Sequence, residues 1–382
     1  MKSKKTVAVI FGGNSVEHDV SIITAHTPII DTLLTLDEYE VIPIYITKEG
    51  LWYSDEKMNR LDYFKGDIQE RLRKLQPLRF LIGEKFSIIT STIITKKIDI
   101  DLVFPAMHGT YGEDGSLMGI LRMANAPFIG SDMSASVIAM DKVLTKQMAS
   151  VAGLPVTHYD WLTRDEWEKD QESFVERVNI MQWPLFVKPA HLGSSIAIAK
   201  VKNRSELKQA LEVAFHYDDK VLVEESVENL IEVTLPIMGN NVLTTAFIER
   251  PLNKTAFFNF EDKYLSGGKK GFDSGMNNEY SEIPANISLE LSERVLELGK
   301  AVYRLIGCAG IARVDFLIDA KTNRVFVNEV NTLPGSLYHH NWKAFGVSNA
   351  DLIRRLIQLA EERFTKEQKI VRTFRSPLLR EK

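Results

Sequence analysis

Two runs of β-forming residues near the C-terminus carry the side chains best suited to chemistry. One run, residues 313–318, contains an arginine and an aspartate, and the other, residues 326–331, contains a glutamate and asparagines. The stretch between them, residues 319–323 (Asp-Ala-Lys-Thr-Asn), is typical of a turn. The two runs are therefore predicted to pair as an antiparallel β-hairpin.

Pairing of these runs gathers four polar side chains on one strand face. With the turn centred near Thr322, equal counting sets Asp315 opposite Glu329 and Arg313 opposite Asn331. Opposed Cβ atoms lie roughly 4.5–5.5 Å apart, so two carboxylates and an amide oxygen can share a hard cation. The alternative is an ordinary solvated face of an edge hairpin.

A second candidate is a lysine beside a flexible turn. Residues 184–188 predict a strand that ends in Lys188, followed by Ala-His-Leu-Gly-Ser-Ser and a second predicted strand at residues 196–201. A cation beside a turn of backbone amides suits phosphate oxygens, although a plain hairpin turn explains the same pattern. The chain lacks both GxxxxGK[ST] and a GxGxxG after its first strand, so any nucleotide is held in another way.

Two segments of the first third follow apolar strands, one around Glu17 and one at residues 108–115. Ligands of open α/β sheets bind beyond the carboxyl ends of the strands, where Glu17 suits an ammonium group. A helix cap by Ser15 and a first-turn position for Glu17 explain the same residues more simply. His18 and His108 can likewise each be a structural histidine with satisfied hydrogen bonds.

These residues need a scaffold, and the hydrophobic pattern of the first third predicts an open α/β sheet. Strands are expected at residues 6–11, 39–46 and 100–105, with helical stretches after Ser15 and after Gly115. We place this first domain at residues 1–130.

Two further domains and a tail are expected. The central domain, residues 131–224, is predicted to be an α+β unit with a helix from about Asp141, strands at 184–188, 196–201 and 220–224, and a helix from Ser205. The C-terminal domain, residues 225–366, contains further strands, a helix at 289–306, the hairpin and a closing helix at 348–364. Residues 266–278, with four glycines, predict a long mobile loop, and residues 367–382 form a basic, solvated tail.

Composition narrows the class of protein. The 382 residues are 45% hydrophobic and 26% charged with a net charge of -4, which is ordinary for a soluble globular protein and gives no reason to expect nucleic acid. No run approaches the roughly 18 apolar residues of a membrane span, and the apolar run near the start is too short for a signal peptide. We expect a cytoplasmic protein. The single cysteine, Cys308, excludes an internal disulfide and suits a core position.

Seven motifs, taken together, resemble those of the D-alanine-D-alanine ligase family of the ATP-grasp superfamily. In chain order they are GGNSVEHDVS, MHGTYGEDGS, MDKVLTK, FVKPAHLGSS, EDKYLS, ARVDFLID and NEVNTLPG. The resemblance extends from about Val7 to Phe364. It implies a three-domain ATP-grasp fold, mixed α/β and α+β, in which ATP lies between the central and C-terminal domains and small D-amino acid substrates lie against the N-terminal domain.

The resemblance also implies roles for individual residues. Asp315, Glu329 and Asn331 are expected to bind two Mg²⁺ ions, with Mn²⁺ as an alternative. The residues expected to contact ATP are Lys142, Lys188 and Lys263 at the phosphates and Glu224 and Glu232 at the adenine and ribose. Glu17 is expected to contact the ammonium group of the first amino acid, His108 to lie near that substrate, and Tyr264 with Ser194 to close the site. Most members of the family are dimeric, so a homodimer is expected.

The implied reaction is formation of D-alanyl-D-alanine for peptidoglycan precursor synthesis. The carboxylate of the first D-amino acid attacks the γ-phosphate of ATP to give an acyl phosphate, and the amine of the second attacks the acyl carbon. Arg313 and the backbone N–H of Gly335 are expected to stabilise the oxyanion. A lid is needed because water would otherwise hydrolyse the acyl phosphate.

Three departures from the family pattern concern the acceptor side and the lid. His340 stands where a hydroxyl residue usually helps to hold the carboxylate of the second substrate, Leu192 replaces an acidic residue, and the loop after Tyr264 is long. Two alternatives therefore stay open. One is a paralogous ligase with another acceptor, such as D-lactate or D-serine, and the other is a non-catalytic nucleotide-binding relative.

Overall fold

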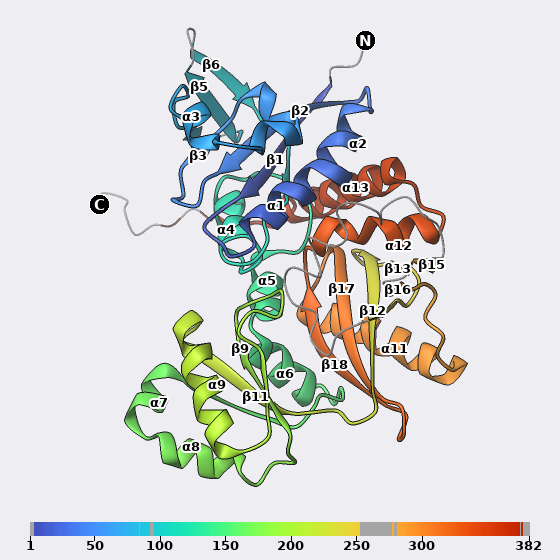
Figure 1. Cartoon of the computed structure of the whole chain (residues 1–382). Coiled ribbons are helices and arrows are strands. Elements are labelled where there is room, and N and C mark those ends of the chain that lie inside the picture. The colour runs from blue at the N-terminus through green and yellow to red at the C-terminus, as the bar shows by residue number, and fades with distance from the viewer. Residues whose placement is uncertain are drawn as a thin grey trace.

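The computed structural model describes residues 4–83, 85–91, 95–252, 277–278, 281–374 and 376. Figure 1 shows the N-terminal third in blue at the top, the central part in green at the lower left and the C-terminal part in orange and red on the right. Mixed sheets and helices occur in each part, so the predicted α/β and α+β character is confirmed.

The N-terminal part is built on a sheet of order β3-β2-β1-β7. Strand β1 (Lys5–Gly12) pairs in parallel with β2 (Tyr39–Ile46) and with β7 (Leu102–Pro105), and β3 (Trp52–Tyr53) closes one edge antiparallel to β2. Parallel strands covered on both faces are continuous apolar runs, which is the character of residues 7–11. The predicted open α/β sheet is therefore confirmed.

Short helices and a small second sheet complete this part. The helical segments are α1 (His18–Thr24), the π-helical η1 (Ala25–Ile30), α2 (Asp31–Leu34), the 3-10 turns η2 (Glu56–Asn59) and η3 (Leu61–Phe64), α3 (Ile68–Leu72) and α4 (Ser116–Met123). The second sheet is antiparallel, in the order β4 (Arg79–Leu81), β5 (Ser87–Ser91) and β6 (Thr95–Asp99).

Two helices lead into the central part. They are α5 (Met133–Met140) and α6 (Lys142–Val151), and Asp141 caps α6 by accepting from the backbone N–H groups of Val143 and Leu144. Cap residues of this kind satisfy amide groups that have no partner inside the helix. The start of α6 is therefore fixed where the sequence predicted it, with Lys142 at its first position.

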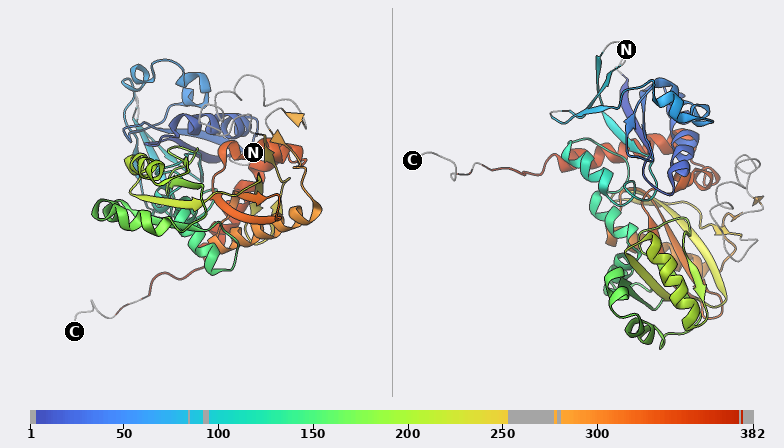
Figure 2. Two further views of the ribbon diagram at one scale, coloured as in Figure 1. Left: turned by 60° about the horizontal axis from the view of Figure 1, so that its bottom comes forward. Right: turned by 60° about the vertical axis from the view of Figure 1, so that its left-hand side comes forward.

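The central part is a four-stranded antiparallel sheet covered by helices. Its order is β10 (Ala199–Val201), β9 (Leu185–Pro189), β11 (Lys220–Glu225) and β8 (Tyr159–Thr163), and its helices are α7 (Arg164–Lys169), α8 (Gln171–Val178) and α9 (Arg204–Tyr217). Leu207, Leu211 and Phe215 of α9 pack on Val187 and Val223 of the sheet. Figure 2 shows this layered unit projecting away from the rest of the molecule.

The predicted strand at residues 196–201 is too long. Only Ala199–Val201 pairs with β9, because Ser194, Ser195 and Ala197 have φ angles of 55°, 59° and 55°. Backbone in this left-handed region cannot continue a strand. The segment between Lys188 and β10, predicted to contact phosphate, is therefore a compact irregular turn of several residues.

The C-terminal part contains the longest strands. Its sheet has the order β13 (Leu243–Thr245), β12 (Leu230–Gly239), β17 (Gly310–Asp319) and β18 (Arg324–Asn331), and α11 (Leu289–Ile306) packs on it with the predicted bounds. A Cβ added to Gly299 of α11 would lie 2.5 Å from Leu235 Cδ2, so a larger residue here would displace the Leu235 side chain. The remaining elements are β14 (Arg250–Pro251), β15 (Asn277–Asn278), β16 (Ser281–Glu282), the 3-10 turn η4 (Gly335–Tyr338), α12 (His339–Ala344) and α13 (Asn349–Glu367).

The first and last parts of the chain share one hydrophobic core. Trp342, Ile353 and Leu356 from the C-terminal helices belong to the same buried cluster as Val7 and Phe11 of β1. Ion pairs join the two parts at the surface, from Lys5 to Glu361 and from Arg354 Nε to Glu38 Oε1 at 3.0 Å. In Figure 1, α13 lies beside the N-terminal helices.

Two smaller findings concern Cys308 and the helices. Cys308 is 7% exposed, and burial raises the pKa of its thiol to about 12, as expected for a core residue that is not a nucleophile. Within the described part of the chain, none of the helices combines the length and apolar character that crossing a bilayer requires.

Candidate active site

The hairpin formed by β17 and β18 carries the predicted cluster of four polar side chains. Asp315 lies opposite Glu329 and Arg313 opposite Asn331, which confirms the predicted pairing. Arg313 donates from Nε and Nη2 to the two carboxylate oxygens of Asp315 at 2.7 and 2.6 Å. Asn331 Nδ2 donates to Asp315 Oδ2 at 3.2 Å. The four side chains thus share one face.

A bulge makes this register work. At the turn end of the hairpin Asp319 pairs with Arg324 and Phe316 with Val327, and the register shifts by one between Asp315 and Phe316. The turn centre therefore lies half a residue before Thr322, and the extra residue, Asn328, restores the counting. Bulges of this kind redirect side chains beside functional sites.

The electrostatics of this face suit a cation. Burial raises the pKa of Asp315 to about 6, although the Arg313 guanidinium acts in the opposite direction, and the facing Glu329 adds to the rise. Two carboxylates and an amide oxygen are hard oxygen ligands, which Mg²⁺ prefers. Lys142 Nζ lies 3.9 Å from Glu329 Oε2. The residues present therefore fit a divalent metal.

Glu224 on β11 is a buried carboxylate whose electrostatic environment is opposite to that of Asp315. Its side chain contacts two ammonium groups, Lys146 Nζ at 2.7 Å and Lys188 Nζ, and accepts a hydrogen bond from Thr157 Oγ1. Although Glu224 is only 1% exposed, these ion pairs hold its pKa well below its usual range against the effect of burial. The predicted phosphate contact Lys188 is thus fixed by the predicted nucleotide contact Glu224.

Sequence reasoning missed Lys146. It lies one turn after Lys142 on α6, so the two side chains share a helix face, and a lysine at that position resembles an ordinary solvated residue. The structure instead buries it to 1% exposure. The spacing of two lysines four residues apart in MDKVLTK is the signal that was available.

The turn after β9 contacts the N-terminal part. Ser194 Oγ donates to Glu17 Oε1 across 177 residues of sequence, and Lys142 Nζ donates to the backbone oxygen of Leu192 at 2.6 Å. Glu17 is 6% exposed, and burial together with the nearby Glu113 raises its pKa. The structure therefore brings Glu17, Ser194 and Lys142 together.

The simpler alternative, with Ser15 as a helix cap and Glu17 in the first turn, differs from the structure in the position of Glu17. Helix α1 begins at His18, and Glu17 at its N-cap position makes no side-chain cap bond. The hydroxyl of Ser15 accepts from the backbone N–H of Glu17 at 3.1 Å. The Glu17 carboxylate is left to face the turn that contains Ser194.

The two histidines of this region differ. His18 is structural, with Nδ1 at 2.7 Å from the backbone oxygen of Gly13 and Nε2 at 3.0 Å from the Tyr45 hydroxyl. His108 is buried with Nε2 at 2.8 Å from Thr24 Oγ1 and Nδ1 at 3.7 Å from Glu113, and Glu113 raises its pKa against the effect of burial.

Thr24 also reaches the segment after Gly335. Its hydroxyl oxygen accepts from the backbone N–H of Ser336 at 3.1 Å, so one side chain connects His108 with the predicted oxyanion turn. In that turn Ser336, Leu337 and Tyr338 have φ angles of 48°, 54° and 53°, a strained backbone of the kind that surrounding contacts must hold in place. Sequence reasoning missed Thr24 because no motif marks it.

On the acceptor side, His340 forms a pair that the sequence did not suggest. Its Nε2 lies 2.9 Å from Glu249 Oε2, which also accepts from Asn341 Nδ2 at 3.0 Å. Glu249 is 4% exposed, and these contacts lower its pKa against the effect of burial. The His340 ring lies 4.6 Å from the Tyr338 ring, over which the Arg313 guanidinium sits at 5.2 Å. His340 is thus linked through one aromatic ring to Arg313, the predicted oxyanion contact.

Comparisons with known proteins agree with this geometry. Family models described as "D-ala D-ala ligase N-terminus" and "D-ala D-ala ligase C-terminus" match residues 6–131 and 148–358. A D-alanine-D-alanine ligase of Chlorobium phaeovibrioides is 36% identical, with 94% of this chain and 97% of that protein covered. One of Geobacillus thermodenitrificans is 35% identical, with 97% and 99% covered. The chain belongs to the D-alanine-D-alanine ligase family.

Solved structures of the D-alanine-D-alanine ligase family have the same fold. The ligase from Coxiella burnetii is 29% identical with a TM-score of 0.77, and the alignment covers 96% of both chains. The VanG D-Ala:D-Ser ligase from Enterococcus faecalis is 30% identical with a TM-score of 0.75, with 94% of this chain and all of that chain covered. The ATP-grasp fold that the motifs predicted is thereby confirmed.

Some residues predicted for this family are not brought into the cluster. Glu232 lies exposed on β12, where its charge contributes to the raised pKa of Lys188. Lys263, Tyr264 and residues 266–276 lie outside the described residues. The final pair of the predicted loop, Asn277–Asn278, forms β15 against β16.

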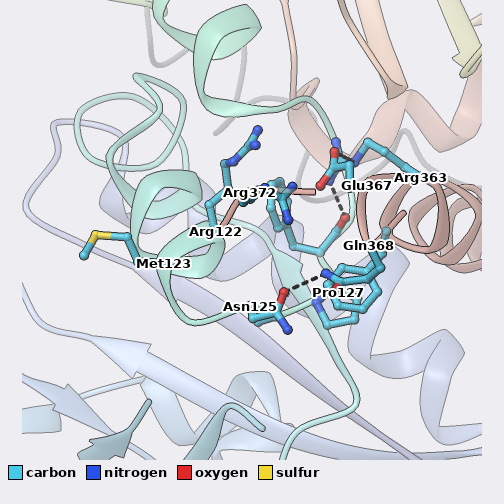
Figure 3. Close-up of a pocket in the computed structure, with 11 residues that line it drawn as sticks. Arg122, Met123, Asn125, Pro127, Arg363, Glu367, Gln368 and Arg372 are labelled. Carbon is cyan, nitrogen blue, oxygen red and sulfur yellow. Dashed lines mark hydrogen bonds and ion pairs between the residues drawn. The ribbon is translucent and has the colours of Figure 1, made fainter. Parts of the chain in front are cut away.

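A separate pocket lies between α4 and α13, away from the D-alanine-D-alanine ligase residues (Figure 3). Arg363 spans it, contacting the backbone oxygens of Gly130 and Phe128, and Gln368 Nε2 donates to Asn125 Oδ1 at 2.6 Å. None of the predicted site residues lines this pocket. The contacts of Arg363 and Gln368 at this pocket join the first and last parts of the chain.

Proposed function

We propose that the protein joins two D-alanine molecules to D-alanyl-D-alanine at the expense of ATP, through an acyl phosphate, for peptidoglycan precursor synthesis. The observation that carries this proposal is the hairpin face, where Arg313, Asp315, Glu329 and Asn331 are in register beside Lys142. A module that only binds nucleotide has no need of an arginine held among metal ligands. The non-catalytic alternative is therefore not favoured.

ATP is proposed to bind between β9, β11 and the hairpin. Lys142 and Lys188 contact its phosphates together with Lys263, and Glu224 and Glu232 lie toward the adenine and ribose. Glu224 orients Lys188 through their ion pair, so the ammonium group is positioned before nucleotide arrives. Because the reaction consumes ATP, we propose a cytoplasmic location, and the homodimer stays a prediction.

Asp315, Glu329 and Asn331 are the residues that hold metal in this proposal, in a set that suits two Mg²⁺ ions and also Mn²⁺. When bound, Mg²⁺ neutralises charge on the ATP phosphates as the γ-phosphate is transferred. Arg313 balances part of the carboxylate charge through its two hydrogen bonds to Asp315, and so keeps both carboxylates usable as ligands.

The first D-alanine is proposed to bind beside Glu17, which accepts from its ammonium group, with His108 close by. Ser194 holds the Glu17 carboxylate in place, so the N-terminal part and the phosphate turn approach the substrate together. The substrate carboxylate then attacks the γ-phosphate and forms the acyl phosphate. Tyr264 and Ser194 exclude water from this product.

The amine of the second D-alanine is proposed to attack the acyl carbon, and phosphate leaves. Arg313 and the backbone N–H of Gly335 stabilise the oxyanion of the tetrahedral intermediate. The Arg313 guanidinium is held by Asp315 on one side and the Tyr338 ring on the other, so little reorganisation is needed as charge develops.

The acceptor pocket carries His340, held by Glu249, where the family usually has a hydroxyl residue. An imidazole at this position can still donate a hydrogen bond to the carboxylate of the second D-alanine. The VanG relative is named a D-Ala:D-Ser ligase, whereas the curated relatives are named D-alanine-D-alanine ligases. Ligation of D-alanine to a different acceptor, such as D-serine or D-lactate, is therefore the alternative and not the favoured function.

Phosphate release from ATP and Mg²⁺ tests the assignment, with mass analysis of the products. D-Alanine is offered alone, and then together with D-lactate or D-serine. Formation of D-alanyl-D-alanine from D-alanine alone is expected. Mixed products at the expense of this dipeptide would instead support a changed acceptor, and absence of any D-amino acid-dependent phosphate release would contradict the ligase proposal.

A further inference from the structure

A charged cluster formed by His191, Asp141 and Asp218 has no role in the reaction described above. It lies at the start of the turn at residues 190–198, here called the phosphate turn. His191, the third residue after Lys188, places Nδ1 at 2.9 Å from Asp218 Oδ1 and Nε2 at 3.3 Å from Asp141 Oδ2. Its backbone N–H also donates to Asp218 Oδ2, at 2.7 Å. One residue therefore makes three polar contacts with two carboxylates from different elements.

The two carboxylates belong to elements that frame the nucleotide site. Asp141 caps α6, whose first residue is Lys142, and Asp218 caps the C-terminal end of α9 just before β11. The backbone N–H of Lys142 donates to the carbonyl oxygen of Ala190 at 3.1 Å. His191 therefore connects α6, the phosphate turn and the α9–β11 junction.

The turn needs such an anchor because its own backbone is strained. Ser194, Ser195 and Ala197 all have φ angles between 55° and 59° without being glycine. Each such residue costs on the order of 1 kcal/mol or more, and persists only where surrounding contacts hold it. The contacts of His191 lie directly before this strained stretch.

The charges around His191 are almost fully paired. Lys220 Nζ donates to Asp141 Oδ2 at 2.7 Å and lies 4.9 Å from the ring of Trp161 on β8, and Asp219 is the remaining acid near the imidazole. Hydrogen bonds to Asp141 and Asp218 raise the pKa of His191 to about 9, so the ring is an imidazolium at neutral pH. Both ring nitrogens then donate, and no lone pair is left for a metal ion.

We propose that His191 is a positioning residue which, by bridging Asp141 and Asp218 as an imidazolium, fixes the turn at residues 190–198 for the phosphates of ATP. The proposal rests on the proposed ATP-dependent function. His191 itself contacts neither substrate nor metal ligand in this account, and it acts through the backbone of the turn and through Lys142.

The test compares two variants with the wild type. His191→Asn removes the charge, and His191→Arg keeps a cation that can reach two carboxylates. At pH 7.5 with saturating D-alanine, we expect His191→Asn to raise KM for ATP about tenfold with kcat within about twofold, a cost of ~1.4 kcal/mol in binding. His191→Arg is expected to restore KM to within about threefold of wild type. His216→Asn, at an exposed histidine of α9, is the matched control and should change neither constant.

Two further readouts separate positioning from a general structural role. Amide hydrogen exchange of residues 190–198 should accelerate in His191→Asn while exchange in the β9–β11 core stays unchanged, and this measurement needs no turnover. Because the pKa of His191 is raised to about 9, its bridge between Asp141 and Asp218 contributes fully below about pH 6.5 and is lost as pH rises through about 9. KM for ATP of the wild type should therefore rise through pH 9, whereas that of His191→Arg, which shares all the lysines, should rise less.

Several results would overturn the proposal. Unchanged KM and unchanged exchange in His191→Asn would show that the turn holds itself, and a His191 ring found neutral by NMR at pH 7.5 would remove the bridge. Zn²⁺ binding by the wild type that is lost in His191→Asn would show that the cluster is a metal site. Failure of the ligase function would appear differently, as a wild-type protein without turnover but with a turn protected from exchange.

Discussion

Two carboxylates of the candidate active site, the buried Glu224 and the half-buried Asp315, lie on different sheets and have opposite electrostatics. Glu224 is 1% exposed and contacts two ammonium groups, so its pKa lies well below the usual range. Asp315 has one arginine but faces Glu329, and burial raises its pKa to about 6. Glu224 thus contacts two cations, whereas Asp315 contacts one and faces a second carboxylate.

This difference separates two roles for carboxylates in the candidate site, which are holding lysine side chains in position and binding a metal ion. Where the protein supplies its own cations, the carboxylate is a structural anchor that holds lysine side chains ready for phosphate. Where two carboxylates face each other, with Arg313 on Asp315 and Lys142 at 3.9 Å from Glu329, we propose that a bound metal ion supplies further positive charge. Three substitutions or conditions test the comparison, in order of decreasing effect.

The largest effect is expected at the hairpin face. Asn331→Ala removes a proposed oxygen ligand of the metal and the hydrogen bond to Asp315 Oδ2, and turnover should fall by at least about 10,000-fold, or ~5.5 kcal/mol. Phosphate release with saturating ATP, Mg²⁺ and D-alanine measures it. Asn286→Ala, at an exposed loop position, is the control. An Asn331→Ala enzyme with near wild-type turnover would remove the metal assignment of this face.

A smaller effect, on stability and not on metal, is expected at Glu224. Glu224→Gln leaves the buried Lys146 and the half-buried Lys188 without their anion, and the free energy of unfolding should fall by about 3–5 kcal/mol. Urea denaturation followed by circular dichroism measures this loss, with Glu228→Gln at an exposed position as control. If Glu224→Gln unfolded like the wild type, the lysines would be carrying their charge without help from this residue.

The smallest effect concerns the pH dependence of metal stabilisation. A raised pKa at Asp315 favours the neutral carboxyl in the folded protein, and this contribution is lost as pH rises through about 6. Metal needs the ionised form, so Mg²⁺ with ADP should raise the thermal midpoint more at pH 7.5 than at pH 5. At 100 times Kd the expected gain at pH 7.5 is about 2.7 kcal/mol. An equal gain at both pH values would contradict an acid of raised pKa in the metal site.

The hairpin set was predictable because its members lie close in sequence. Strand alternation and a turn signal suffice to pair Asp315 with Glu329, and the bulge at Asn328 corrected a turn centre that had been placed half a residue too late. The helices at 142–151, 204–217 and 289–306 were predictable for a similar reason, because their caps and apolar periods are local.

Contacts between distant segments were not predictable in the same way. Glu249 and Thr24 lie in none of the seven motifs. Lys146 and His191 lie in MDKVLTK and FVKPAHLGSS, but each of the four residues meets its partner only when separate elements come together. A buried charge within an amphipathic segment has the same sequence pattern as a solvated one, so its partner has to be seen. The predicted length of the second strand, residues 196–201, was wrong because the sequence does not show which non-glycine residues adopt positive φ angles, as Ser194, Ser195 and Ala197 do.

The shared core of the first and last parts has a consequence for synthesis on the ribosome. Strand β1 leaves the exit tunnel among the first residues, yet Ile353 and Leu356 of α13, which cover the same cluster, are made about 350 residues later. At about 5–20 residues per second, the nascent N-terminal sheet waits some tens of seconds with part of its apolar surface bare. The central unit has its own cluster and can fold in that interval. Chaperones that shield nascent chains should therefore associate with the N-terminal third until the last helix emerges.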